Sequence, residues 1–193
     1  MVRPSRHDPS VLVDAAVRLA AAEGPAAVTM AAVAKASGAP NGSVYHRFPN
    51  RAALLSELWI RTVERFQDGY LAALASHPDP ARAGAAAARH VVSWSRANPE
   101  QAAVLLHGAE ALGRKEWPAA QAARADAGTE RARAALASLA KRLDASTPVD
   151  VDRVTLAVVD LPLALVRRHL RAGAPLPAHA EDLAEECAAD LLR

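Results

Sequence analysis

The stretch from Thr29 to Arg51 gathers side chains that could bind a nucleic acid. Amide, hydroxyl, imidazole and guanidinium groups follow one another closely, among them Asn41, Tyr45 and Arg47. An amide can pair with the edge of an adenine, and a hydroxyl or cationic donor can bind a phosphate oxygen. Gly42 lies among these residues, and a glycine lets a backbone approach a ligand closely. The chemistry available to this stretch is therefore recognition of a polyanion.

The distribution of charge favours the same kind of partner. Residues 1–51 hold six Lys/Arg against three Asp/Glu, and residues 52–193 hold seventeen against eighteen, so the net charge of +2 divides into +3 and −1. Basic side chains at phosphates release counterions and supply the sequence-independent part of nucleic-acid affinity. A small basic module thus precedes a larger, nearly neutral one.

The composition predicts an all-α fold. The 193 residues are 51% hydrophobic and 4% aromatic, and about a quarter are alanine. Nowhere do β-branched and aromatic residues alternate at a period of two, which excludes an all-β protein or a Rossmann enzyme.

The cysteine content and the apolar segments indicate in which cellular compartment the protein works. A single cysteine, Cys187, cannot form an intrachain disulfide, which favours a reducing compartment and hence the cytoplasm. The polar, basic residues 1–10 lack the apolar core of a signal peptide, and Asp160 and Pro162 interrupt the most apolar later stretch. We expect neither a signal peptide nor a membrane span.

Apolar periodicity and capping residues predict three helices in the first 51 residues. The first covers Val11–Ala22 and ends at Gly24-Pro25, and the second covers Met30–Ser37, with Thr29 as its N-cap and Gly38 after its end. The third lies within residues 39–48, with Pro40 in its first turn and Val44 and Phe48 facing inward. Two short helices joined by a glycine-containing turn form a helix-turn-helix.

The remaining residues predict a long fourth helix, capped by Asn50 and running to Ser76, that joins the two modules rigidly. Proline-containing breaks then divide the chain into five further helices, giving about nine in all. These lie near residues 80–97, 99–112, 118–143, 149–172 and 178–192.

The segment Gly38–Arg51, together with Leu54-Leu55, resembles the signature of TetR-family transcriptional repressors. Gly42, Tyr45, Phe48 and Leu54-Leu55 match that family's pattern. Arg47 stands where His or Tyr is usual, and Arg51 where Lys is usual, so both departures keep or add positive charge. The resemblance is specific over residues 9–58, and the rest of the chain is similar to the family only in length and helix count.

The resemblance implies a ligand-responsive repressor that binds a palindromic operator in double-stranded DNA as a homodimer and is released by a small-molecule effector. We expect a flexible basic arm at residues 1–8, a helix-turn-helix DNA-binding domain at 9–51, and a ligand-binding and dimerisation domain at 52–193. No catalytic residues, cofactor or metal are expected, because no catalytic constellation is present and the histidines lack metal-site spacing.

The expected DNA contacts come from the helix-turn-helix and the start of the fourth helix. Residues near the beginning of the third helix should read bases, whereas Tyr45 and Arg51 should bind phosphates. The full set is Thr29, Met30, Lys35, Pro40, Asn41, Gly42, Ser43, Tyr45, His46, Arg47 and Arg51.

Several of these residues have a second interpretation. Asn41 can pair with a base or simply cap the third helix, and Gly42 can admit the DNA backbone or serve a tight turn. His46 can be a solvated surface histidine, and Arg47 can pair with an acid of the first helix. Lys35 can lie on a solvated face.

Bulky rings among many alanines suggest a cavity for a hydrophobic or mixed-polarity small molecule. The candidate ligand-binding residues are Trp59, Phe66, Trp94, His107 and Trp117, and the alternative is that these rings fill the core.

Two apolar stripes near the carboxy terminus are candidates for the dimer interface, mainly on the strength of the resemblance. They consist of Val154, Val158, Leu161 and Leu165, and of Leu183, Cys187 and Leu191. A stripe that faces the chain's own core has the same spacing.

Two other classes of function compete with the repressor. One is a helical enzyme, for which Asp160 is the one acid inside an apolar helical stretch. The other is a helical adaptor that binds protein instead of DNA.

Overall fold

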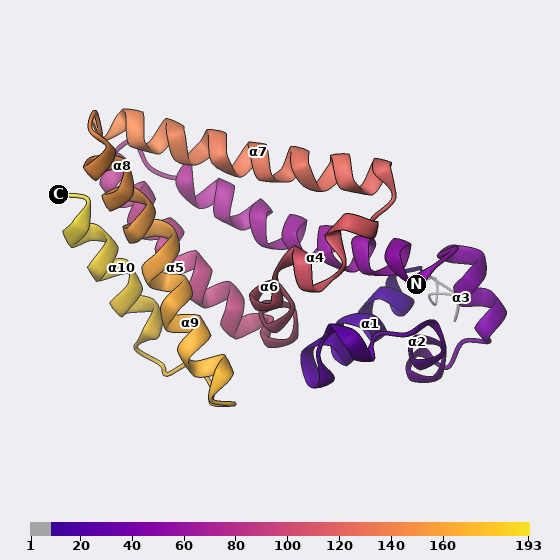
Figure 1. Ribbon diagram of the computed structural model, residues 1–193. Coiled ribbons are helices and arrows are strands. Elements are labelled where there is room, and N and C mark those ends of the chain that lie inside the picture. The colour runs from indigo at the N-terminus through magenta and orange to yellow at the C-terminus, as the bar shows by residue number, and fades with distance from the viewer. Residues whose placement is uncertain (1–8) are drawn as a thin grey trace, which may run out of the picture. The chain divides into compact units, whose positions relative to one another are not determined.

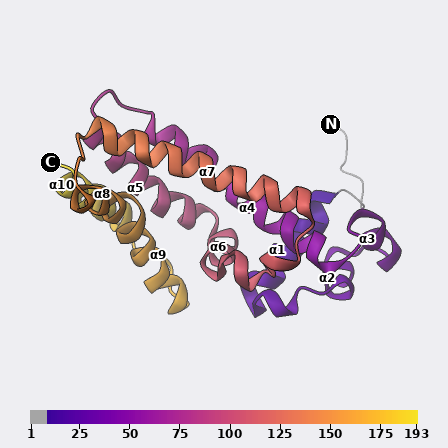
Figure 2. The same ribbon diagram turned by 45° about the horizontal axis from the view of Figure 1, so that its top comes forward.

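The computed structural model describes residues 9–193 and shows an all-α fold, as predicted (Figures 1 and 2). The expected arm at residues 1–8 lies outside the described residues. The helices are α1 (Pro9–Glu23), η1 (Pro25–Ala27), α2 (Met30–Ser37), α3 (Asn41–Arg47), α4 (Arg51–Leu74), α5 (Pro80–Ala97), α6 (Pro99–Ala111), η2 (Arg114–Glu116), α7 (Ala119–Arg142), α8 (Pro148–Thr155), η3 (Leu156–Asp160), α9 (Leu161–Arg171) and α10 (Ala180–Leu191).

The residues that were expected to cap helices do so. The Thr29 hydroxyl oxygen accepts from the Ala32 amide at 3.1 Å, and the Asn50 side-chain oxygen accepts from the Ala53 amide at 2.9 Å. Gly38 closes α2 with a left-handed φ of 69°, a conformation that costs glycine little. These local bonds explain why α2 and α4 begin where the sequence predicts.

Three details differ from the prediction, each for a local reason. Pro40 is the N-cap of α3 and lies just before its first turn. Gly108 breaks α6 with a φ of 80°. The helix expected near 149–172 consists of α8, the π-helical turn η3 and α9, because Pro162 has no N–H and cannot donate the α-helical bond to the carbonyl four residues earlier.

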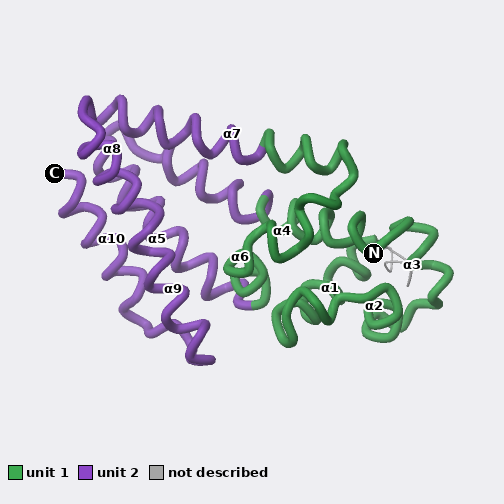
Figure 3. The backbone as a smooth tube through the Cα atoms, viewed as in Figure 1, with its two compact units in different colours: residues 1–63, 100–127 green, residues 64–99, 128–193 purple. Residues whose placement is uncertain are grey.

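The chain divides into two compact units (Figure 3). Unit 1 comprises residues 1–63, described from residue 9 onward, and residues 100–127; unit 2 comprises residues 64–99 and 128–193. The continuous helices α4 and α7 each contribute one part to each unit. These units differ from the predicted division into a DNA-binding domain (9–51) and a ligand-binding and dimerisation domain (52–193), which stays a prediction.

The core of unit 1 holds the helix-turn-helix together. Leu12 of α1, Val33 of α2, Val44 of α3 and Leu54 of α4 are all fully buried in one cluster. Burying side chains of this size contributes about 1.5 to 3 kcal/mol each. The inward positions of Val44 and Phe48 are confirmed, and they fix which face of α3 points outward.

The core of unit 2 depends on small residues. α10 lies alongside α5 in both ribbon views (Figures 1 and 2), and buried Gly84 and Ala88 of α5 belong to the same packed region as Ala184 and Ala188 of α10. A Cβ at Gly84 would collide with the Leu192 side chain, so this glycine allows the close packing. Among the described helices, no segment combines the length and apolarity needed to cross a bilayer.

Candidate nucleic-acid interface and ligand pocket

α2 and α3 form a helix-turn-helix whose turn is closed by backbone hydrogen bonds. The Ala39 amide donates to the Ala34 carbonyl at 3.0 Å, directly after the left-handed Gly38. Val44 is fully buried and Phe48 is 7% exposed. α3 is therefore anchored from its inner side, which leaves the opposite side free.

The outer side of α3 presents unpaired polar groups. Asn41, Tyr45, His46 and Arg47 are exposed, and the Tyr45 ring is 56% exposed. In residues 9–193, no hydrogen bond or ion pair engages the side chains of Asn41, His46 or Arg47. The Tyr45 ring and the free donors are therefore available to a binding partner. This arrangement suits a face that meets bases and phosphates.

Three alternatives are resolved by the structure. Pro40 occupies the N-cap of α3 and no side chain caps that helix, so Asn41 is not a cap. Gly42 does not have a left-handed φ, and a Cβ built there would meet no atom within 4 Å, so no tight turn requires glycine. Asp14 of α1 pairs with Arg61, and no described acid pairs with Arg47.

The structure adds detail to two of the predicted contacts, at Met30 and Arg51, which stay predictions. The Met30 side chain is 7% exposed and belongs to the core of unit 1, so only its backbone amide can face a phosphate. Arg51 donates from Nε to the Val28 carbonyl and from Nη2 to the Pro25 carbonyl, each at 2.7 Å. Arg51 thus holds the connection between α1 and α2, a role that sequence reasoning missed because its partners are 23 and 26 residues away.

The other members of the predicted set lie on the same module. Thr29, Lys35 and Pro40 are exposed, and Ser43 is half-buried. The structure therefore brings most of the predicted DNA-binding residues to the surface of α2, α3 and the segments before them.

Unit 2 contains an apolar pocket of about 180 Å³. Phe66 and Tyr70 of α4 are stacked with ring centroids 5.4 Å apart. Phe66 also meets Trp94 edge to face at 5.3 Å. The lining residues are Phe66, Gln67, Tyr70, Val91, Ala132, Leu136, Val158, Val159 and Leu163.

Of the five predicted ligand-binding residues, only Phe66 lines this pocket. Trp94 is its neighbour in unit 2, whereas Trp59, His107 and Trp117 belong to unit 1. Trp117 is a core residue whose indole N–H donates to the Leu112 carbonyl at 2.9 Å. The predicted set is therefore divided between the two units: Trp117 fills the core of unit 1, as the alternative interpretation proposed, whereas His107 is exposed.

Sequence reasoning missed Gln67 as a pocket residue. Gln67 lies on the apolar stripe of α4, next to Phe66 and three residues before Tyr70. A polar residue on such a stripe is a signal that could have been used, because buried polar groups need partners.

Burial shifts the pKa of two titratable side chains beside the pocket, Tyr70 and His90. Burial raises the pKa of the Tyr70 hydroxyl, which donates to the Val158 carbonyl. Desolvation lowers the pKa of His90, although its Nε2 lies 3.2 Å from the Phe66 carbonyl oxygen and that contact acts in the opposite direction. In both cases burial disfavours the charged form.

The predicted dimer residues divide into core and surface. Val154, Val158 and Leu165 are buried in the core of unit 2, which corrects their assignment to an interface. Leu161, Cys187 and Leu191 are half-buried. The exposed large apolar side chains of this region are Val149, Val151, Leu156 and Leu183.

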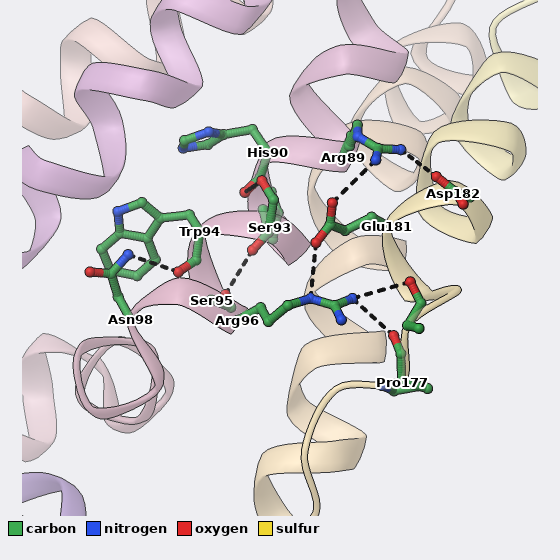
Figure 4. Close-up of polar contacts among 12 residues, drawn as sticks. Arg89, His90, Ser93, Trp94, Ser95, Arg96, Asn98, Pro177, Glu181 and Asp182 are labelled. Carbon is green, nitrogen blue, oxygen red and sulfur yellow. Dashed lines mark hydrogen bonds and ion pairs between the residues drawn. The ribbon is translucent and has the colours of Figure 1, made fainter.

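An ion-pair network joins α5 to the beginning of α10 (Figure 4). Arg89 contacts Asp182 at 2.5 Å and Glu181 at 3.2 Å. Arg96 contacts Glu181 at 2.9 Å and donates to the Pro177 carbonyl at 2.9 Å. Linked pairs of this kind fix orientation more than isolated surface pairs do. The network holds α10, and with it Leu183, in place on α5.

A helix-turn-helix followed by further helices is an arrangement that DNA-binding regulators use. Residues 12–58 match the family described as bacterial regulatory proteins, tetR family. A comparison with curated protein sequences finds no match. Residues 12–58 thus match the amino-terminal domain of the TetR family, which confirms the resemblance over that part of the chain.

Solved structures show the same fold over nearly the whole chain. A TetR-family regulator from Marinobacter aquaeolei VT8 has a TM-score of 0.75 at 18% identity and covers 96% of this chain and 95% of its own. The ketosteroid regulator KstR2 of Mycobacterium tuberculosis has a TM-score of 0.73 at 19% identity and covers 99% of this chain and 95% of its own. FadR from Bacillus subtilis, solved with stearoyl-CoA, has a TM-score of 0.72 at 14% identity and covers 95% of this chain and 97% of its own.

Proposed function

We propose that this protein is a ligand-responsive repressor that binds a palindromic operator in double-stranded DNA as a homodimer. The observation that carries the proposal is the outer side of α3, where free donors surround a glycine that the fold itself does not need. A DNA-binding function implies the cytoplasm.

The roles of the α3 residues follow from the chemistry of the duplex. Asn41 has a free amide that can pair with both edge groups of an adenine in the major groove. Gly42 lets the helix backbone approach the DNA. Tyr45, His46 and Arg47 lie on the same short helix and can donate to phosphates, which positions α3 without reading the sequence.

Dimerisation is proposed through the exposed apolar face of unit 2. Val149 and Leu156, together with half-buried Leu191, line a surface groove of about 470 Å³, and Leu183 is 40% exposed. An isologous dimer would cover this face and present two α3 helices to half-sites about 34 to 36 Å apart.

The effector is proposed to occupy the apolar pocket of unit 2. The lining supports an apolar effector, because every lining residue except Gln67 is aliphatic or aromatic. If operator and effector favour different arrangements of the chain, each weakens binding of the other, and a coupling of about 1 to 3 kcal/mol changes affinity 5- to 150-fold. The continuous helix α4 contributes both to unit 1 and to the pocket, which makes it the proposed connection.

A gel shift with the DNA that flanks the protein's own gene tests this function. We expect a saturable, salt-sensitive shift by a dimer, lost when Gly42 and Tyr45 are both replaced. Asn41→Ala should change which operator variants are preferred, and Tyr45→Ala should weaken binding to all of them. The absence of any shift at low salt would favour the helical adaptor instead.

A further inference from the structure

We propose that the pocket of unit 2 selects a small, neutral, apolar molecule that carries a hydrogen-bond donor, and that the Gln67 side-chain oxygen accepts from that donor. The inference rests on the proposed effector response, and it names the chemical class of the effector and the residue that recognises it.

The volume and lining of the pocket limit the size and charge of its ligand. An apolar cavity of about 150 Å³ is large enough to bind benzene, and this pocket measures about 180 Å³. A six-membered ring with one substituent therefore fits. None of the described residues that line the pocket is charged. A charged ligand would lose its hydration without gaining an ion pair, which is costly.

Tyr70 offers the pocket an acceptor and no donor. Its hydroxyl proton is directed to the Val158 carbonyl oxygen, 3.1 Å away, and both groups are buried. The remaining capacity of the hydroxyl oxygen is that of an acceptor. A ligand that presented only acceptors would find no proton here.

Gln67 supplies a second acceptor, and it lacks a partner. The side chain is 8% exposed, and its Nε2 donates to the Gly128 carbonyl at 3.2 Å. That bond fixes the orientation of the amide, because the reverse orientation would place two oxygens together. In the described part of the chain, no group donates to the buried Oε1.

The backbone of α7 leaves room for this arrangement. A Cβ at Gly128 would lie 3.3 Å from Gln67 Oε1, tighter than an ordinary contact, so glycine at this position accommodates the amide. Ala132, one turn further along α7, lines the pocket. The unpaired oxygen thus lies beside α7, next to the pocket that Gln67 and Ala132 both line.

An unpaired buried acceptor provides a physical basis for selectivity. Leaving such a group without a partner is unfavourable, and a ligand donor that pairs with it removes this cost. Sites with buried polar groups reject analogues that lack the matching group more strongly than purely apolar pockets do.

The test uses phenol and toluene, which differ by a hydroxyl in place of a methyl group, in NMR titrations of the whole chain. Gln67→Met removes the acceptor and keeps a side chain of similar length. The ratio of the toluene Kd to the phenol Kd should fall about tenfold in this variant, the equivalent of one buried hydrogen bond. Leu136→Met, a volume-conserving change in the lining, should leave the ratio unchanged.

A second comparison needs no variant and remains decisive if Gln67→Met does not fold. Anisole keeps the ring and the oxygen of phenol but has no donor, so it should bind the unaltered chain about tenfold more weakly. Benzoate, which is anionic, should bind more weakly than phenol as well.

An unchanged ratio in folded Gln67→Met, or equal binding of phenol and anisole, would overturn the assignment of donor recognition to Gln67. Failure of both phenol and toluene to bind would overturn the pocket as a ligand site. A gel shift of the unaltered chain with operator DNA tests the repressor function separately from ligand recognition. If the shift is seen, the repressor function stands even when the ligand proposal fails. If no shift is seen, the repressor function is rejected whatever the probes show.

Discussion

The Tyr70 hydroxyl donates a hydrogen bond to the Val158 carbonyl across unit 2, with 3.1 Å between the two oxygens. Val158 lies in the π-helical turn η3, four residues before Pro162. In an α-helix the amide of residue 162 would donate to this carbonyl, but proline has no amide hydrogen. A side chain of α4 thus satisfies a carbonyl that a proline in another helix has deprived of its usual donor.

Removing this hydroxyl should destabilise the fold. Tyr70→Phe leaves the buried Val158 carbonyl without its side-chain donor, and we expect the free energy of unfolding to fall by about 1 to 2 kcal/mol. Urea denaturation measures the change. Tyr45→Phe is the matched control, because the Tyr45 ring is 56% exposed and this change should leave stability within about 0.5 kcal/mol.

Pro162→Ala should reduce the importance of the same bond. An alanine at this position can donate the α-helical bond to Val158, so the cost of Tyr70→Phe should be smaller in the Pro162→Ala background. A double-mutant cycle by denaturation gives the coupling energy. Purely additive effects would show that Tyr70 stabilises the protein in some other way.

Gly42→Ala should act in opposite directions on folding and on DNA binding. The position lies inside α3 with no atom within 4 Å of a Cβ, so alanine should stabilise the free protein by about 0.5 to 1 kcal/mol. The added methyl group would separate α3 from the duplex, and we expect about a tenfold loss of operator affinity, or about 1.4 kcal/mol. Unchanged affinity by fluorescence anisotropy would refute the close approach of the backbone.

Arg51 and Arg47 should behave differently although both are exposed arginines near α3. Arg51→Ala removes the bonds to the Pro25 and Val28 carbonyls, so it should lower stability by about 1 kcal/mol as well as weaken DNA binding.

Arg47→Ala breaks no described bond and should leave the unfolding free energy nearly unchanged. If Arg47 contacts a phosphate, its loss should reduce the slope of log affinity against log salt concentration by about 1. Denaturation curves and salt titrations of both variants check this contrast, and equal destabilisation by the two would contradict the structural role of Arg51.

Stability should depend on pH through His90. Burial lowers the pKa of His90 in the folded chain below its unfolded value of about 6.5. As pH falls below about 6.5, the unfolded chain binds a proton that the folded chain resists, so stability decreases until the lowered folded pKa is passed. The decrease should be smaller in His90→Phe, whereas the same substitution at exposed His77 should retain it. Denaturation at several pH values gives both slopes.

Local features of the sequence determined the helices and the helix-turn-helix. Thr29, Gly38 and Asn50 act through hydrogen bonds or backbone preferences that span only a few residues, so their effects can be read from the chain alone. The exposed outer side of α3 followed from the helical spacing of Val44 and Phe48.

Only the tertiary structure decided which apolar faces meet and which polar groups remain unpaired. The stripe of Val154, Val158 and Leu165 has the same spacing whether it faces the chain's own core or a second copy, and the choice depends on helices far away in the sequence. The carbonyl partners of Arg51 and the unpaired oxygen of Gln67 are likewise long-range facts, because a side chain's burial and its partners depend on what packs against it.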